Sequence, residues 1–305
     1  MTIEISLLIK KAISSIQESM YVSTDTITLC IAAICARGHI LIEDTPGVGK
    51  TTLAKIISST FSLETKRVQC TNDLLPSDVL GYYTLNNTNQ TLTFKKGPVF
   101  TNILLVDEIN RASPRTQSAL LEVMEERCVT IDGTTSKIPE PFIVLATQNP
   151  SEHSGTFQLP QSQLDRFICR LSLGYPDAQN ELGILKGVFN SNIIPHALID
   201  STILNKIYDA TQKICMSDSV LQYLIELITA TRKSKELITG ISPRGALQIK
   251  LMAQAIALIQ GRNFVLPDDI HTVFVPCCEH KTKCAVPDKS TISVLQTILS
   301  TTPLP

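Results

Sequence analysis

Asp44-Thr-Pro-Gly-Val-Gly-Lys-Thr51 follows a short apolar run that begins at His39, and it precedes residues 51–61, whose apolar positions have helical spacing. A strand, a glycine-containing loop and a helix in this order form a phosphate-binding loop, because loop N–H groups and the helix start attract negative charge. In such a loop the Lys50 ammonium reaches the outer phosphates and the Thr51 hydroxyl takes a place on Mg2+. The stretch therefore predicts a nucleotide site after the first strand.

A second stretch, Ile103-Leu-Leu-Val-Asp-Glu108, reads as a buried strand that ends in two carboxylates. A strand-end Asp107 can hold the metal, and Glu108 can polarise an attacking water. Either stretch alone also occurs by chance, and the loop begins with Asp44 where the common pattern has glycine. The two together, in this order and at this spacing, predict that the chain binds ATP with Mg2+ and hydrolyses it.

Length and composition indicate an ordinary globular protein, with two domains as the expectation for 305 residues. The net charge of −1 and the pI near 6.5 give no overall attraction to nucleic acid or to an anionic membrane. The most apolar window, residues 27–36, is too short to span a bilayer, and we expect no secretory signal. Nine cysteines without regular spacing indicate a reducing compartment, so we expect a cytoplasmic protein without stable membrane insertion.

Apolar runs alternate with helical segments up to residue 174, which predicts an α/β domain with a five-stranded parallel sheet between helices. The expected strands are 39–43, 66–69, 103–107, 142–147 and 167–171. Ligands of such sheets lie at the carboxyl ends of the strands, where the phosphate loop, Asp107, Glu108 and Asn149 would meet. From residue 175 the pattern is helical alone, at 177–189, 199–213, 218–232, 243–261 and 267–275. We therefore expect a nucleotide-binding core over 1–174, an all-helical lid over 175–283 and a tail over 284–305.

Two inserts interrupt the core pattern. Residues 81–97 alternate polar and apolar side chains around an asparagine-rich turn, and residues 127–137 have Asp132-Gly133 at their centre. Both patterns predict β-hairpins. A hairpin that projects from an α/β core contacts a partner or lines a channel, although a plain decorated loop gives the same pattern.

Three further side chains are candidates for the chemistry. Asn149 follows the strand at 142–147 and can orient the attacking water, although asparagine before proline is also ordinary turn chemistry. Arg166 stands at a helix end before a strand, where it can pair with Asp165 or project to a neighbouring subunit's nucleotide. Arg244 opens a lid helix and could reach back to the phosphates. Each arginine alone is more often a surface ion pair.

The ordered set resembles the AAA+ superfamily and, within it, the MoxR family of bacterial ATPases. The likeness runs from about residue 3 to 283 and is carried by residues 41–51, 106–112, 116–127, 129–133, 146–150, 163–167, 174–176 and 241–244. The resemblance implies an ATPase core with a helical lid that works as a homo-oligomer, usually a hexameric ring.

The same resemblance implies roles for particular residues. The catalytic set would be Glu108, Asn149 as first sensor, Arg166 as the arginine finger acting on the adjacent subunit, and Arg244 as second sensor. The cofactor-binding set would be Pro46, Gly47, Val48, Gly49, Lys50, Thr51, Thr52 and Asp107, with Thr51 and Asp107 at the metal. Family members are described as chaperone-like factors that remodel or assemble a protein client, often with a partner that carries a von Willebrand factor A domain.

Two other functions stay open from the sequence. A nucleotide-gated ring scaffold with slow hydrolysis needs the same nucleotide motifs. A DNA-directed AAA+ motor is disfavoured by the near-neutral charge, and we expect no nucleic-acid partner.

Overall fold

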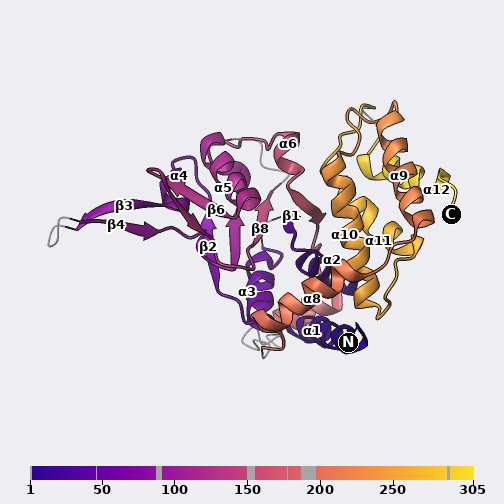
Figure 1. Cartoon of the computed structure of the whole chain (residues 1–305), viewed down its shortest axis with the longest axis horizontal. Coiled ribbons are helices and arrows are strands. Elements are labelled where there is room, and N and C mark those ends of the chain that lie inside the picture. Colours follow the sequence, from indigo (N-terminus) through magenta and orange to yellow (C-terminus); the bar gives the residue numbers. More distant parts are fainter. Residues whose placement is uncertain are drawn as a thin grey trace.

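The computed structural model describes residues 2–45, 47–86, 91–149, 155–176, 178–186, 197–286 and 289–305. Figure 1 shows a hairpin projecting from a helix-covered sheet, with a group of helices from the C-terminal part of the chain on the other side.

Five parallel strands form the central sheet, in the order β2-β5-β8-β1-β9. Their bounds are β1 His39–Glu43, β2 Thr65–Gln69, β5 Ile103–Asp107, β8 Ile143–Gln148 and β9 Phe167–Leu171. The predicted five-stranded parallel sheet is confirmed, and the observed bounds of β2 and β8 differ from the predicted ones by single residues. In the middle of the sheet Leu145 of β8 lies between Ile40 of β1 and Leu105 of β5. The carboxyl ends of these three strands therefore share one edge.

Alternate residues of the strands enter two separate cores, as the period of two requires. Ile40 and Ile42 face the core that contains helices α1 Thr2–Ser19, α2 Thr24–Cys35 and α3 Lys50–Thr60. Leu41 faces the other core, which contains α5 Pro114–Glu126. Short helices connect these elements: α4 Pro76–Leu80, η1 Ile109–Arg111 and α6 Gln161–Leu164.

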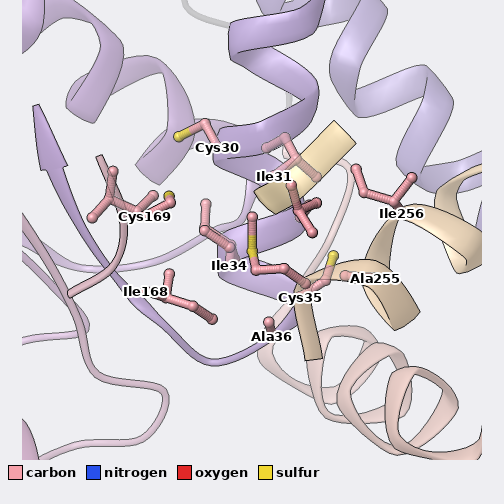
Figure 2. Packing of buried hydrophobic residues seen from close by; sticks show 14 of the residues in the cluster. Cys30, Ile31, Ile34, Cys35, Ala36, Ile168, Cys169, Ala255 and Ile256 are labelled. Atoms are coloured by element: carbon pink, nitrogen blue, oxygen red, sulfur yellow. The ribbon is translucent and has the colours of Figure 1, made fainter. Parts of the chain in front are cut away.

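Apart from the first of them, which contributes no described residue, the C-terminal helices share the core of Ile40 and Ile42 with the sheet. They are α7 Ala178–Leu185, α8 Ser201–Lys213, α9 Asp218–Lys233, α10 Pro243–Ile259, α11 Pro267–Cys278 and α12 Thr291–Thr301, and we call them the lid helices. Figure 2 shows how α10 is joined to the sheet: Ile34 and Cys35 of α2 lie between β9 and the α10 residues Ala255 and Ile256. Because α10 packs on α1, α2 and β9, buried apolar contacts hold it against the sheet in this structure.

Two of the lid helices differ from the expected ranges. Helix α11 runs past the expected end at 275, with Pro276 inside it. Helix α12 lies in the region expected to be a tail, and it buries Val294, Leu295 and Ile298. In this last segment apolar residues recur every three to four positions, so they share one face of the helix and can pack.

Both inserts contain two-stranded antiparallel sheets. In the first, β3 Gly81–Asn86 pairs with β4 Thr91–Lys96, and this hairpin projects from the body of the molecule (Figure 1). In the second, β6 Cys128–Ile131 pairs with β7 Thr134–Lys137 through Asp132 and Gly133. Both turn residues have positive φ, 48° and 78°, which is the backbone that a two-residue hairpin turn requires.

Candidate active site

The loop between β1 and α3 has the backbone of a phosphate-binding loop. Gly47 has a φ of 89° and Gly49 a φ of 94°, a region that residues with a side chain rarely adopt. Gly49 is the N-cap of α3 and offers no side chain to the first-turn N–H groups, so these remain available to an anion. Of the predicted loop residues, Lys50, Thr51 and Thr52 form the first turn of α3, and Val48 packs against the core. Pro46 lies outside the described residues.

Lys50 is surrounded by acidic groups at this edge of the sheet. Its ammonium donates to the backbone carbonyl of Asp44 at 2.6 Å, so the side chain curls back across the loop. Burial lowers the pKa of Lys50, and the nearby carboxylates of Asp44, Asp107 and Glu108 oppose that shift. The structure therefore brings together the two stretches that the sequence singled out.

Asp107 and Glu108 end β5 in different environments. The Asp107 carboxylate is nearly buried, and it accepts hydrogen bonds from the Thr147 hydroxyl at 3.3 Å and from Arg67 Nε at 2.6 Å. Glu108 has a φ of 56°, and its backbone N–H donates to the Thr147 hydroxyl at 3.0 Å. This turn in the backbone directs the Glu108 carboxylate away from the strand, toward side chains on β2.

Side chains that the sequence analysis did not select hold the Glu108 carboxylate. Gln69 Nε2 donates to Glu108 Oε2 at 3.0 Å, and Arg111 reaches the same oxygen at 3.1 Å. Arg67 in turn donates to Gln69 Oε1 at 3.0 Å, so β2 contacts both carboxylates. The sequence signal for these contacts was the position of Arg67 and Gln69 at a strand end. The sequence did not reveal that β2 lies beside β5.

Asn149 directly follows β8, and its side chain is buried. Because β8 lies between β5 and β1, this residue shares the carboxyl edge of the sheet with Glu108 and the phosphate loop.

A pocket of about 360 Å³ lies beside the phosphate loop. It is lined by residues that include Met20, Tyr21, Val22 and Tyr175. A Cβ built on Gly49 would stand 3.9 Å from Met20 Cε, and Thr45 donates to the Tyr175 hydroxyl at 3.0 Å, so the pocket adjoins the loop. The sequence analysis missed this pocket, because its walls come from the α1–α2 turn and from the chain after β9.

Arg166 and Arg244 lie together at the opposite edge of the sheet. Arg166 immediately precedes β9, and its Nε donates to Glu125 Oε2 at 2.9 Å. Arg244 of α10 pairs with the other oxygen of Glu125. The packing of α10 brings its first turn to the amino ends of the strands, so in this structure Arg244 lies away from the chain's own phosphate loop. A full strand length separates this pair from Lys50.

Several polar contacts tie the lid helices to the segment around Arg166. The Ser242 hydroxyl donates to Asp165 Oδ2 at 2.9 Å and caps α10 through the N–H of Gly245. Arg170 of β9 pairs with Glu43 at the end of β1 and, at 2.6 Å, with Glu279 at the end of α11. The segment that carries Arg166 therefore contacts both the lid and the strand that leads into the phosphate loop.

The donor set at the carboxyl edge fits Mg2+. Asp107 provides a carboxylate whose side chain is only 10% exposed, and Thr51 provides a hydroxyl in the first turn of α3. Mg2+ prefers oxygen ligands and keeps several waters, so one or two protein ligands suffice. In this structure the Arg67 guanidinium provides the positive charge at Asp107.

Comparison with known proteins agrees with this geometry. Residues 39–169 match the family described as "ATPase family associated with various cellular activities (AAA)", and residues 229–299 match the AAA lid domain. The chain is 42% identical to the uncharacterized protein YeaC of Bacillus subtilis over 267 residues, which cover 86% of this chain and 83% of that protein. It is 33% identical to the chaperone MoxR1 of Mycobacterium tuberculosis over 317 residues, 97% of this chain and 82% of the relative.

A solved structure has the same fold. The crystal structure of a candidate ATPase from Cytophaga hutchinsonii superposes with a TM-score of 0.92 at 34% identity, covering 100% of this chain and 97% of that one. Among the described residues, no helix has both the length and the apolarity that crossing a membrane requires.

Proposed function

Since the chain belongs to the MoxR family of AAA ATPases and hydrolyses ATP, we propose that hydrolysis takes place at the carboxyl edge of the sheet. Lys50 and the N–H groups around Gly47 and Gly49 bind the phosphates, and Glu108 orients the attacking water. The observation that carries this assignment is the position of Lys50, which lies within electrostatic reach of Asp107 and Glu108.

Thr51 and Asp107 are the proposed protein ligands of Mg2+, which when bound would neutralise charge on the phosphates. Binding at Asp107 requires that the Arg67 guanidinium gives up its 2.6 Å contact. Gln69 and Arg111 both bind Oε2 of Glu108, and release of this oxygen would leave both carboxylate oxygens available to the attacking water. Asn149, buried at the same edge, is the proposed second group that orients the water.

The pocket lined by Met20, Tyr21 and Val22 is the proposed site of the base and ribose. It adjoins the phosphate loop, and its apolar side chains with a few polar groups suit an aromatic base.

Arg166 and Arg244 are proposed to act on the nucleotide of a neighbouring subunit. Both lie at the edge of the sheet opposite the chain's own phosphate loop, so another copy of the chain must bring phosphates to them. An arginine supplied in this way raises the rate of hydrolysis ~10³-fold or more in related nucleotide hydrolases. This arrangement requires a homo-oligomer, for which we propose a hexameric ring with a core over 1–174 and a lid over 175–283, to which α12 of the expected tail adds a further helix.

The work done by hydrolysis is proposed to be chaperone-like remodelling of a protein client. The β3–β4 hairpin supports this role, because it projects from the body and exposes Tyr82, Leu85 and Leu92. A partner with a von Willebrand factor A domain is part of the same proposal. All nine cysteines are free thiols, which supports a cytoplasmic location.

Glu108→Gln tests the assignment of the water-orienting group. The variant should bind labelled ATP as the wild type does and lose turnover. Glu226→Gln, the same change on the exposed face of α9, is the matched control and should keep both properties. Turnover retained by Glu108→Gln would refute the role given to Glu108.

Arg166→Ala tests the role of the neighbouring subunit. We expect the wild-type rate per subunit to rise with protein concentration, and the rate of the variant to stay low and flat. A concentration-independent rate shared by both proteins, from a monomer, would contradict the ring arrangement.

A nucleotide-gated scaffold with slow hydrolysis is the second candidate. Its support is the resting contact of Glu108 with both Gln69 and Arg111, which occupies one oxygen of the carboxylate. ATP-dependent assembly with a low rate that no partner or client changes would favour the scaffold over the remodelling factor.

A further inference from the structure

A second pocket, of about 240 Å³, lies between the amino edge of the sheet and α10. Four of its lining residues are arginines, namely Arg37, Arg127, Arg166 and Arg244, and its only lining carboxylate is that of Glu125. Four guanidinium groups and one carboxylate leave a net excess of three positive charges around the pocket. This volume is many times the ~10–15 Å³ that one water needs, so a larger ligand can enter.

Two of the four arginines have no carboxylate partner within the described part of the chain. Arg127 donates to two backbone carbonyls, those of Phe142 at 3.3 Å and Arg37 at 3.2 Å, and Glu140 attracts it only at longer range. Burial lowers the pKa of Arg127, which reflects the cost of holding its charge there. Arg37 lies over the ring of Tyr208 at 4.3 Å from the centroid, and its guanidinium makes no ion pair with any acid among the described residues.

The surroundings of Arg37 add a second observation. Tyr208, whose ring packs against the Arg37 guanidinium, is 2% exposed. Its hydroxyl has no hydrogen-bond partner among the described residues. A cation held on an aromatic face keeps its N–H groups free at the edge of the guanidinium plane. Arg37 is thus held in place without using the donors that would bind a ligand.

We propose that this pocket binds a phosphate oxyanion, and that Arg37 and Arg127 are ligands for it beside Arg166 and Arg244. Guanidinium groups are planar, weakly hydrated and matched to phosphate oxygens, and an oxyanion would compensate the unpaired charges. The oxyanion has two candidate sources. The first is the nucleotide of a neighbouring subunit, and for this source the proposal rests on the proposed function. A free inorganic polyphosphate presents the same chemistry to the same groups.

The first experiment tests the free-anion source. The phosphate loop of the full chain is first filled with ADP and Mg2+, and tripolyphosphate is then titrated in by calorimetry. We expect one further binding event, weakened about tenfold in Arg37→Gln because a charge-assisted contact is lost. Arg115→Gln, the same charge change at an exposed position on α5 outside the pocket, is the matched control and should bind as the wild type does.

The second experiment tests the nucleotide of a neighbouring subunit as the source. Arg37→Gln should bind labelled ADP at its own loop as the wild type does, but turn ATP over roughly tenfold more slowly at assembled concentrations. Excess Lys50→Ala chain, which has an intact arginine pocket and a disabled phosphate loop, should restore turnover to the Arg37→Gln subunits. Arg115→Gln should need no such rescue.

The outcomes separate this inference from the proposed function. Tripolyphosphate binding that depends on Arg37, or slow turnover that the Lys50→Ala chain restores, supports the pocket and identifies the source. If Arg37→Gln changes neither property while Arg166→Ala loses turnover, Arg37 is not a ligand of the oxyanion, the inference fails, and the proposed function of Arg166 stands. If Arg166→Ala also keeps turnover, the action across subunits fails as well. Arg37→Gln is the primary variant because the Arg37 side chain makes no hydrogen bond with any described residue, and equal melting temperatures would show that the fold is kept.

Discussion

Acidification is expected to destabilise the fold through His39, at the start of β1. The ring is 5% exposed and packs edge-on against Phe142. The backbone N–H of Val144 donates to its Nδ1 at 3.0 Å, so the proton is on Nε2, which donates to the carbonyl of Met124 at 3.1 Å. A second proton on Nδ1 would face the Val144 N–H and displace this hydrogen bond.

The size and sign of the effect follow from these surroundings. Burial, with the positive charge of Arg127 as a smaller cause, lowers the pKa of His39 from its ordinary value of 6.5 to about 4. Between these values the unfolded chain binds the proton and the folded chain does not, so the free energy of unfolding falls as the pH is lowered through this window. At ~1.36 kcal/mol per pKa unit, the full loss is about 3 kcal/mol, complete below pH ~4.

His39→Gln provides the measurement, because glutamine offers a donor and an acceptor but does not titrate. Urea unfolding followed by circular dichroism at several values between pH 7.5 and 4.5 gives the free energy of unfolding for both proteins. We expect the advantage of the wild type to shrink by about 2–3 kcal/mol across this range. His280, the other buried histidine among the described residues, contributes equally to both proteins. Parallel profiles would refute the reasoning.

Three further predictions concern the nucleotide site and the lid. Gly49→Ala should weaken binding of labelled ADP about tenfold or more, because a φ of 94° is strained for any residue with a Cβ; unchanged affinity would mean that the loop relaxes. Arg170→Gln should lower the free energy of unfolding by about 2 kcal/mol, since it leaves two half-buried carboxylates without their cation, and thermal or urea unfolding measures this. Arg67→Gln should tighten binding of Mn2+ in the presence of ADP, as followed by electron paramagnetic resonance, because the competing cation at Asp107 is removed; weaker binding would show instead that Arg67 orients the carboxylate.

Local sequence patterns were sufficient to predict the elements that form the sheet and the loop. Continuous apolar runs identified β1, β5 and β8, and the glycines at 47 and 49 occur where the backbone needs positive φ. These features depend on residues that are neighbours in the chain, so periodicity and turn chemistry report them directly.

Contacts between distant segments could not be predicted in the same way. Arg67 meets Asp107 only because β2 lies beside β5, and strand order is not encoded in the period of either strand. Arg244 and Glu125 are 119 positions apart, and their pairing depends on how α10 packs on α1, α2 and β9. Apolar surfaces on all these helices identified them as buried, but many pairings of such surfaces satisfy the same pattern.

The contacts around Arg166 imply that the lid and this arginine move together. The carboxylate of Asp165, directly before Arg166, accepts a hydrogen bond from Ser242 at the start of α10, and its backbone carbonyl accepts one from Gln248, six residues later on the same helix. Arg244 lies between these two lid residues and shares Glu125 with Arg166. Any rotation of α10 relative to the phosphate loop must therefore shift both guanidinium groups, because breaking the contacts would leave several half-buried polar groups without partners. We expect the nucleotide state of one subunit to affect the neighbouring site mainly through this joint displacement. The two arginine side chains should change little relative to each other.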